Sequence, residues 1–285
     1  MSVTLEESYR HSCQIARKTA KNFYYSFLVM PREKRQAMCA IYAFMRRSDD
    51  IADSAANPAV ALEGLRKWRA EVDEALAERG EARDPILLAL CDTVQRYSIP
   101  QKHFHEVLDG TEMDQTTTRY ATFDDLYKYC YRVASAVGLV VLPIFGYKDP
   151  AALAPAEACG IAFQLTNILR DVKEDARLGR IYLPLEDLKK FGVSENDITS
   201  ANATPQFLEL MKFEAARARQ YYDKAKPLLT MVHPDSRGTL AVMLGIYSGI
   251  LRKIEQKNFA VFDERIRLSP AEKLWIVARH WGRKA

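Results

Sequence analysis

Apolar residues recur at steps of three and four positions along most of this chain, which is the period of a helix with one buried face. No stretch alternates apolar and polar residues clearly enough to predict a strand. The pattern therefore predicts an all-α protein, in which Pro31 begins a helix that carries Tyr42 to Asp53. The other expected helices cover 6–20, 60–79, the segment between Pro85 and Pro100, 101–118, 123–146, 206–229, 236–258 and 270–281, with one more inside 160–184.

Prolines, glycines and aromatic residues interrupt this pattern without dividing the chain. The segment KNFYYSFLVMP, which ends at Pro31, breaks the helical period, and Gly179, Pro184 and Pro205 mark an irregular stretch. No Pro/Gly/Ser-rich linker, block of like charge or internal repeat separates two parts. We therefore expect residues 1–285 to form a single domain, built as a helical bundle around a central cavity.

The helix inside 160–184 carries a polar stripe of unusual composition. Gln164, Asn167, Asp171 and Asp175 fall within an arc of roughly 80° at about 100° per residue, and the positions between them are mostly apolar. A solvated face normally mixes charges of both signs, whereas this stripe has only oxygen-bearing side chains. Mg²⁺ prefers oxygen ligands, commonly one or two carboxylates together with phosphate oxygens and water. The stripe therefore predicts a magnesium site.

A second acidic pair strengthens this interpretation, because a single Asp-x-x-x-Asp pair is more typical of an exposed helix face. Tyr42, Arg46, Asp49 and Asp53 share one face of the helix that follows Pro31. The two acidic pairs are about 120 residues apart, and in a helical bundle they would face each other. We expect the four aspartates of the two pairs to have no cationic partner in the empty site. Without one, their clustered carboxylates repel one another, so they would act through a metal ion rather than stabilise the fold.

Composition and charge limit the class of protein. The chain has 48% hydrophobic residues, 12 Gly and 12 Pro, which is typical of a globular protein. Its 41 basic and 37 acidic residues give a net charge of +4, too balanced to predict a nucleic-acid partner. A peripheral association with an anionic membrane surface is compatible with that charge.

Cysteines and apolar segments predict a cellular location. The five cysteines are odd in number and scattered, and we expect buried free thiols in a reducing compartment: Cys13, Cys39, Cys91, Cys130 and Cys159. The N-terminus lacks the apolar core of a signal peptide, and the longest apolar stretch, Val133 to Gly146, is too short to span a bilayer. We therefore expect a cytoplasmic protein that is soluble or peripheral at the inner membrane face.

Three segments resemble the squalene and phytoene synthases, which are head-to-head condensing prenyltransferases. They are DDIAD at 49–53, YCYRVASAVG at 129–138, and the run G-x3-Q-x2-N-x3-D-x3-D-x4-R-x-Y-x-P from Gly160 to Pro184. The resemblance implies the isoprenoid synthase fold and a Mg²⁺-dependent prenyltransferase, with Mn²⁺ as an alternative ion. Its metal ligands would be Asp49, Asp53, Asn167, Asp171 and Asp175.

The residue types and the resemblance together give a candidate site. Besides the four aspartates, the resemblance implies that Tyr129 and Tyr247 line the cavity and assist the cyclopropane chemistry. The candidate substrate-binding residues are Lys21, Phe23, Tyr42, Arg46, Gln164, Asn167, Arg170 and Arg180. Arg46 and Arg170 have the alternative role of ion pairs with adjacent aspartates, and each aromatic residue has the alternative of core packing. The acidic residues Glu112 and Asp114 are expected on the surface.

The expected reaction joins two molecules of farnesyl diphosphate into presqualene diphosphate, a squalene and hopanoid precursor. The segment NFYYSF is similar to the bacterial C30 branch that makes this intermediate, although relatives have serines where this chain has Ala20 and Asn22. The partners would be prenyl diphosphates and downstream isoprenoid enzymes. NADPH is not expected, mainly because NFYYSF resembles the branch that stops at presqualene diphosphate; the chain also lacks a glycine-rich dinucleotide motif.

Other functions remain open at this stage. The nearest alternatives keep the fold and change the substrate or product: phytoene synthase acting on two geranylgeranyl diphosphates, or squalene or dehydrosqualene synthase. A terpene cyclase would also use two acidic motifs but would not explain YCYRVASAVG. A catalytically silent helical scaffold is the alternative that is not an enzyme.

Overall fold

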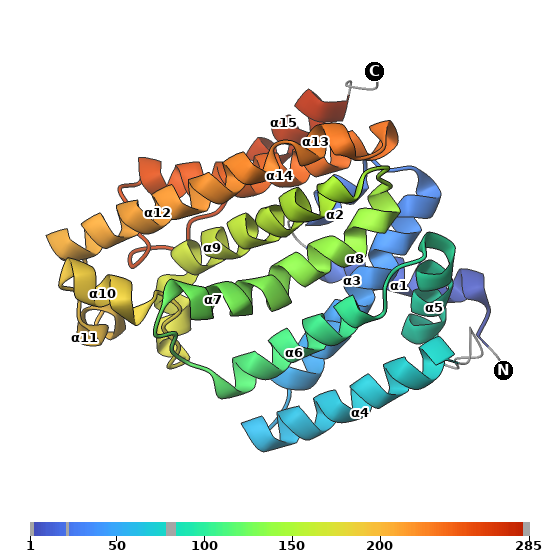
Figure 1. Ribbon diagram of the computed structural model, residues 1–285, viewed down its shortest axis with the longest axis horizontal. Helices are drawn as coiled ribbons and strands as arrows, with labels where there is room; N and C mark the ends of the chain where they lie inside the picture. The colour runs from blue at the N-terminus through green and yellow to red at the C-terminus, as the bar shows by residue number, and fades with distance from the viewer. Residues whose placement is uncertain (1–2, 21–22, 78–83, 282–285) are drawn as a thin grey trace.

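The computed structural model describes residues 3–20, 23–77 and 84–281, and these ranges fold as an all-α bundle (Figure 1). Within them the only β pairings are two isolated bridges, Arg119 with Ile181 and Tyr147 with Val232. The elements are α1 (Leu5–Thr19), α2 (Phe23–Phe27), α3 (Arg32–Asp53), α4 (Pro58–Ala77), α5 (Pro85–Tyr97), α6 (Lys102–Thr116), α7 (Phe123–Cys130), η1 (Tyr131–Ser135), α8 (Ala136–Phe145), η2 (Pro150–Ala152), α9 (Leu153–Arg177), α10 (Leu185–Phe191), α11 (Glu195–Thr199), α12 (Pro205–Ala225), α13 (Leu228–Met231), α14 (Pro234–Gln256) and α15 (Pro270–Trp281).

Local sequence explains where several helices begin. The Thr4 hydroxyl accepts a hydrogen bond from the Glu7 backbone N–H, and the Glu7 carboxylate bonds back to Thr4, which caps α1. Asp84 caps α5 in front of a proline at its first turn, and Thr122 caps α7. These side chains satisfy backbone N–H groups that have no partner inside the helix, so the helix starts are fixed before any packing.

The helices that bear the two polar faces belong to opposite parts of the bundle. α9 packs against α12, α14, η1 and α8, while α3 packs against α1, α5, α4, α6 and α8. Figure 1 shows α7 and α8 running between the α9–α12 layer and the α3 side of the molecule. One hydrophobic core connects these layers.

The long helix expected over 123–146 is continuous but contains a π-helical turn, η1. Gly160 of α9 lies against this turn, and a Cβ atom at Gly160 would be 2.5 Å from the Cα and backbone N of Ser135. The Ser135 hydroxyl donates a hydrogen bond of 2.7 Å to the Glu157 backbone oxygen. Ser135 and Gly160 therefore allow η1 and α9 to pack closely against each other.

The apolar stretch Val133 to Gly146 was expected to be too short to span a membrane, but the helix that contains it is longer than this stretch. Phe123–Phe145 forms 23 continuous helical residues that are apolar enough to cross a bilayer. However, 56% of the apolar window is buried inside the bundle, as in the core helix of a folded protein. No other helix in the described ranges meets the same criteria of length and apolarity.

Several short elements were missed by the periodicity. The aromatic segment before Pro31 contains the five-residue helix α2, and the stretch expected to be irregular contains α10 and α11. The expected helix 206–229 is divided into α12 and α13. Helices of four to seven residues span two turns at most, which is too short for a three-to-four-residue repeat to become visible.

Of the five cysteines, which are all free, four are buried and Cys13 is half-buried.

Candidate active site

An elongated cavity lies between α3, the η1–α8 segment, α9 and α14. Together with the open space at its mouth, the region free of protein atoms measures about 1150 Å³. The side chains of Val133, Val137, Val141 and Phe145 line it at four-residue steps. At about 1.5 Å per residue this row extends for about 18 Å, so the cavity is long as well as apolar.

The polar groups of the cavity gather where α3 faces α9. Arg46 and Asp49 come from α3, and Gln164 and Asn167 come from α9. These four residues were predicted from two segments far apart in the sequence, and the fold brings them to the lining of one cavity. Tyr42 also lines it, as predicted. The cavity therefore has a charged portion and a long apolar portion.

Asn167 presents an oxygen that suits a cation. Its Nδ2 donates a hydrogen bond of 3.3 Å to Gln164 Oε1. Its Oδ1 is buried and has no hydrogen-bond partner among the described residues. A buried oxygen without a donor is costly unless something else satisfies it. This residue fits the role of a neutral oxygen ligand to a divalent ion.

Asp171 has cationic partners, contrary to the expectation that the aspartates have none. Arg170 donates from Nε and Nη2 to its two oxygens at 2.8 and 2.5 Å, and Arg265 does so at 2.7 and 2.9 Å. Burial alone would raise the pKa of Asp171, but the hydrogen bonds and charges of the two arginines outweigh it and lower that pKa. The ion-pair alternative for Arg170 is confirmed, and Arg265 is a residue that the sequence reasoning missed.

Asp175 and Asp49 follow the expectation of mutual repulsion. Burial, followed by the charge of Asp171, raises the pKa of Asp175 to about 7. Burial, followed by the charge of Asp53, raises the pKa of Asp49 to about 7. Asp49 is reached by solvent, yet it lies in a concavity where protein replaces much of the surrounding water. Each of these two carboxyls is therefore partly protonated near neutral pH, and a bound cation would stabilise its ionised form.

Arg46 forms an ion pair with Asp50, the acidic residue beside the expected stripe. The alternative role for Arg46 is thus confirmed, while its guanidinium remains at the cavity lining. Asp53 is exposed on the same helix, one turn beyond Asp49. No three acidic, histidine or cysteine side chains in the described ranges are grouped closely enough to hold one ion. Any metal here would therefore need phosphate or water oxygens to complete its ligands.

Asp114 was expected on the surface, and this is wrong. It accepts a hydrogen bond of 2.9 Å from the Tyr182 hydroxyl and another from Tyr129, and Arg180 Nη2 donates to its backbone oxygen at 2.6 Å. Burial raises its pKa, although the tyrosine hydrogen bonds act in the opposite direction. Its charge also raises the pKa of both Asp49 and Asp175, so it lies near a residue of each acidic pair.

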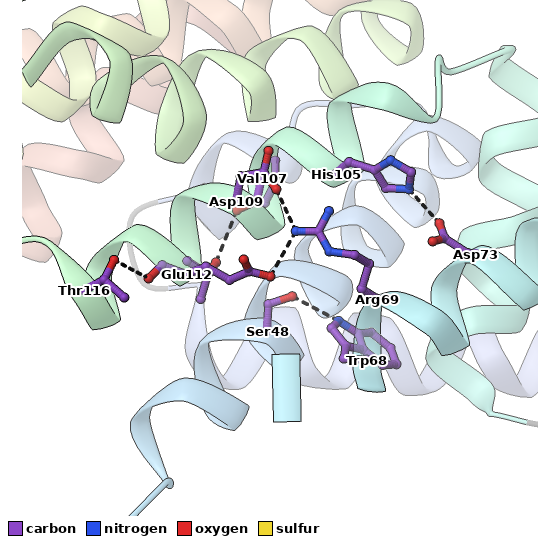
Figure 2. Close-up of polar contacts among 10 residues, drawn as sticks. Ser48, Trp68, Arg69, Asp73, His105, Val107, Asp109, Glu112 and Thr116 are labelled. Atoms are coloured by element: carbon purple, nitrogen blue, oxygen red, sulfur yellow. Dashed lines mark hydrogen bonds and ion pairs between the residues drawn. The ribbon is translucent and has the colours of Figure 1, made fainter. Parts of the chain in front are cut away.

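Glu112, two residues earlier on α6, points elsewhere. Figure 2 shows its carboxylate meeting Arg69 of α4, which also pairs with Asp109. The Glu112 side chain is 30% exposed, so it is only partly the surface residue that was expected. Residues two positions apart on a helix point about 200° apart, which is why Glu112 and Asp114 have different surroundings.

The two candidate tyrosines differ in position. Tyr247 lines the cavity and stacks on Phe163 with ring centroids 4.3 Å apart. Tyr129 is buried beside the cavity but is not among its lining residues, and it stacks on Tyr182 at 5.1 Å. The implied cavity-lining position is therefore found for Tyr247 and not for Tyr129.

The remaining candidates are two arginines near the second acidic pair and two residues whose side chains the structure does not describe. Arg170 is largely buried, with 11% of its side chain exposed, and Arg180 lies close enough to Asp175 for its charge to lower that pKa. Lys21 and the side chain of Phe23 lie outside the described residues. Their roles stay predictions, as do the catalytic and metal-binding roles of the other named residues.

The chain is similar in sequence and in fold to known proteins over most of its length. A family model described as squalene/phytoene synthase matches residues 16–272. A phytoene synthase of Arthrospira platensis is 39% identical, covering 95% of this chain and 91% of that protein. A crystal structure of a dehydrosqualene synthase superposes with a TM-score of 0.89 at 32% identity, covering 97% of this chain and 96% of that one. The squalene synthase HpnC of Alicyclobacillus acidocaldarius gives 0.84 at 30% identity, covering 90% and 95%.

Proposed function

The chain belongs to the squalene/phytoene synthase family, and we propose that it joins two molecules of farnesyl diphosphate head to head into presqualene diphosphate. The observation that carries the proposal is the cavity itself. Its long apolar portion suits two prenyl tails, and its polar end, lined by Arg46, Asp49, Gln164 and Asn167 where α3 faces α9, suits the diphosphates.

Divalent ions fit the charged portion of this cavity. The unpartnered Asn167 oxygen and the raised pKa values of Asp49 and Asp175 are what oxygen ligands without their cation would show. We propose that these residues, with Asp53 and Asp171, hold Mg²⁺, with Mn²⁺ as an alternative. When bound, the ions would supply Lewis-acid neutralisation of the diphosphates.

The chain's own residues would perform the other tasks. Arg46 and Arg170 bind diphosphate oxygens through charge-assisted hydrogen bonds once they leave their aspartate partners. The apolar walls exclude water from the allylic cation that remains after diphosphate departs, and the stacked Phe163 and Tyr247 rings face it. The double bond of the second substrate attacks this cation, and loss of a proton closes the cyclopropane.

A second candidate reaction keeps the chemistry and lengthens the substrate. The Arthrospira platensis relative is a phytoene synthase, which favours two geranylgeranyl diphosphates and a C40 product. The solved structures at 30 and 32% identity are named as squalene and dehydrosqualene synthases, which favours C15 substrates. We prefer the C15 reaction because the row of cavity-lining side chains along α8 ends at the bulky Phe145.

The test is to supply the purified protein with farnesyl or geranylgeranyl diphosphate and Mg²⁺, with and without NADPH, and to identify the products by mass. The proposal expects presqualene diphosphate from farnesyl diphosphate without any reductant. Squalene that appears only with NADPH would overturn the proposed end point. A C40 product formed with a higher kcat/KM would overturn the proposed substrate in favour of the second candidate.

The proposed reaction also suggests where in the cell the protein would act. It would act in the cytoplasm and pass its amphipathic product, a C30 diphosphate, to downstream isoprenoid enzymes. A peripheral position at the inner membrane face would shorten that transfer. Cell fractionation followed by immunoblotting tests this location.

A further inference from the structure

The outer face of α15 is apolar where solvent would favour polar residues. Leu274 and Trp275 are 55% and 62% exposed, and they are two of the six large hydrophobic side chains exposed in the described ranges. Ala271 and Ala278 are exposed one turn before and one turn after them. We call these four residues the outer stripe. A helix that faces only water normally carries polar residues there.

The opposite face of α15 already has its packing partners. Ile276 lies against Gly245 and Gly249 of α14, and Val277 is buried. Lys253 of α14 pairs with Glu272 at 2.8 Å, and Lys273 lies over the Tyr25 ring of α2. The orientation of the helix is therefore fixed by these contacts, and Leu274 and Trp275 of the outer stripe stay largely exposed. In Figure 1, α15 lies at the edge of the bundle beside α14.

The charge around the outer stripe is positive. Arg267 and Arg279 are exposed just before the helix and within its last turn. Neither forms an ion pair with any residue that the structure describes, although Arg279 lies over the Trp275 ring at 5.4 Å. Glu272, the acidic residue within α15, is already paired with Lys253, and Glu264, three residues before Arg267, is paired with Lys257. Asp263 is exposed four residues before Arg267. An apolar stripe with a tryptophan and flanking arginines is the pattern of a helix that lies in a membrane interface.

We propose that α15 is a docking surface for an anionic membrane, with Leu274 and Trp275 entering the boundary between head groups and acyl chains. Arg267 and Arg279 contact the phosphate head groups. A second copy of the chain fits less well, because a two-fold contact through this stripe would bring the arginines of both copies together. Two large side chains also provide far less than the roughly 800 Å² per partner that stable interfaces bury.

The position of this surface relates to the cavity. α15 covers α14, and α14 contributes Leu240, Met243 and Tyr247 to the cavity wall. A membrane held against α15 would therefore lie one helix away from the apolar cavity. This relation to substrate and product rests on the proposed function, whereas membrane docking itself does not.

The test is sedimentation of the full chain with vesicles, either of phosphatidylcholine alone or of equal parts phosphatidylcholine and phosphatidylglycerol. The double variant Leu274→Glu/Trp275→Glu is compared with Val60→Glu, which changes an equally exposed residue (51%) on α4 at the opposite edge of the bundle. Wild type and Val60→Glu should bind the anionic vesicles and release on raising the salt concentration. The double variant should bind at least about tenfold more weakly.

Three results would overturn the proposal: no binding by wild type, equal binding by the double variant, or a wild-type dimer in light scattering that the double variant converts to monomer. Circular dichroism and thermal melting establish that the variants are folded. Turnover of prenyl diphosphates dispersed in detergent is measured in parallel. A protein that docks without turnover would contradict only the proposed function, and one that turns over without docking would contradict only this inference.

Discussion

Arg265 and Asp171 are joined by two hydrogen bonds of 2.7 and 2.9 Å, although they are 94 positions apart in the sequence. Arg265 lies in the segment between α14 and α15, and Asp171 belongs to the second acidic pair on α9. With Arg170 on its other side, Asp171 is the one candidate metal ligand that is already neutralised. A cation or a diphosphate that binds here must compete with these contacts or rearrange them.

Asp171→Asn should therefore destabilise the fold, by about 2 kcal/mol in the free energy of unfolding, because it removes the negative charge and one of the two acceptor oxygens that face a buried arginine. Asp175→Asn should leave stability equal or raised, since it removes a repelled carboxylate. Both variants should lose turnover if the aspartates act through metal. Urea unfolding and product formation measure the two effects. Equal stability of the two variants would contradict the role assigned to the arginines.

Stability of the metal-free protein should depend on pH through Asp49 and Asp175. Their folded-state pKa values of about 7 lie above the roughly 3.9 of an unfolded aspartate, so the folded state binds more protons between these values. Their contribution to stability is present below about pH 4 and is lost as pH rises toward about 7. Melting curves across this range should show a smaller decline in the Asp49→Asn/Asp175→Asn variant. An unchanged decline would refute the assignment.

Mg²⁺ binding should show the opposite pH dependence. The ion needs ionised carboxylates, so the rise in melting temperature caused by Mg²⁺ should grow as pH increases through about 7. The same titration with a diphosphate analogue should give a larger shift, because phosphate oxygens complete the ligands. A Mg²⁺ shift that is constant with pH, or absent with the analogue, would argue against a metal site at these residues.

The two tyrosines should respond differently to loss of the hydroxyl. Tyr247→Phe keeps the ring that stacks on Phe163 at the cavity wall, so it should retain substantial kcat/KM while Tyr247→Ala loses tenfold or more. Tyr129→Phe removes a hydrogen bond to the buried Asp114 and should cost about 1 kcal/mol of stability along with activity. Similar behaviour of the two Phe variants would contradict this distinction.

Gly160 tests the close approach of α9 to the π-helical turn. Gly160→Ala places a Cβ 2.5 Å from the Ser135 backbone, which has no flexible side chain to move aside, and should destabilise the fold by about 1–3 kcal/mol. Gly138→Ala is the matched control, because its nearest contact would be 3.3 Å. Thermal melting of both variants provides the comparison. A milder effect at Gly160 than at Gly138 would contradict the packing described.

The sequence determined the features that depend on neighbours along one helix. The three-to-four-residue period predicted the long α-helices, though not the short ones, and it placed Gln164, Asn167, Asp171 and Asp175 on one face of α9. A local repeat is enough for this because helix geometry fixes the direction of each side chain relative to the next. The same argument found the face of α3, and the motifs carried by both helices identified the family.

The tertiary structure decided what lies across from each face. Asp114 was expected on the surface, yet Arg180 and Tyr182 contact it from positions 66 and 68 residues later in the chain. Arg265 reaches Asp171 only because the segment after α14 returns along α9, and the exposed stripe of α15 follows from how that helix rests on α14. These relations depend on loop paths and helix crossings, which the spacing of residues within one helix does not encode.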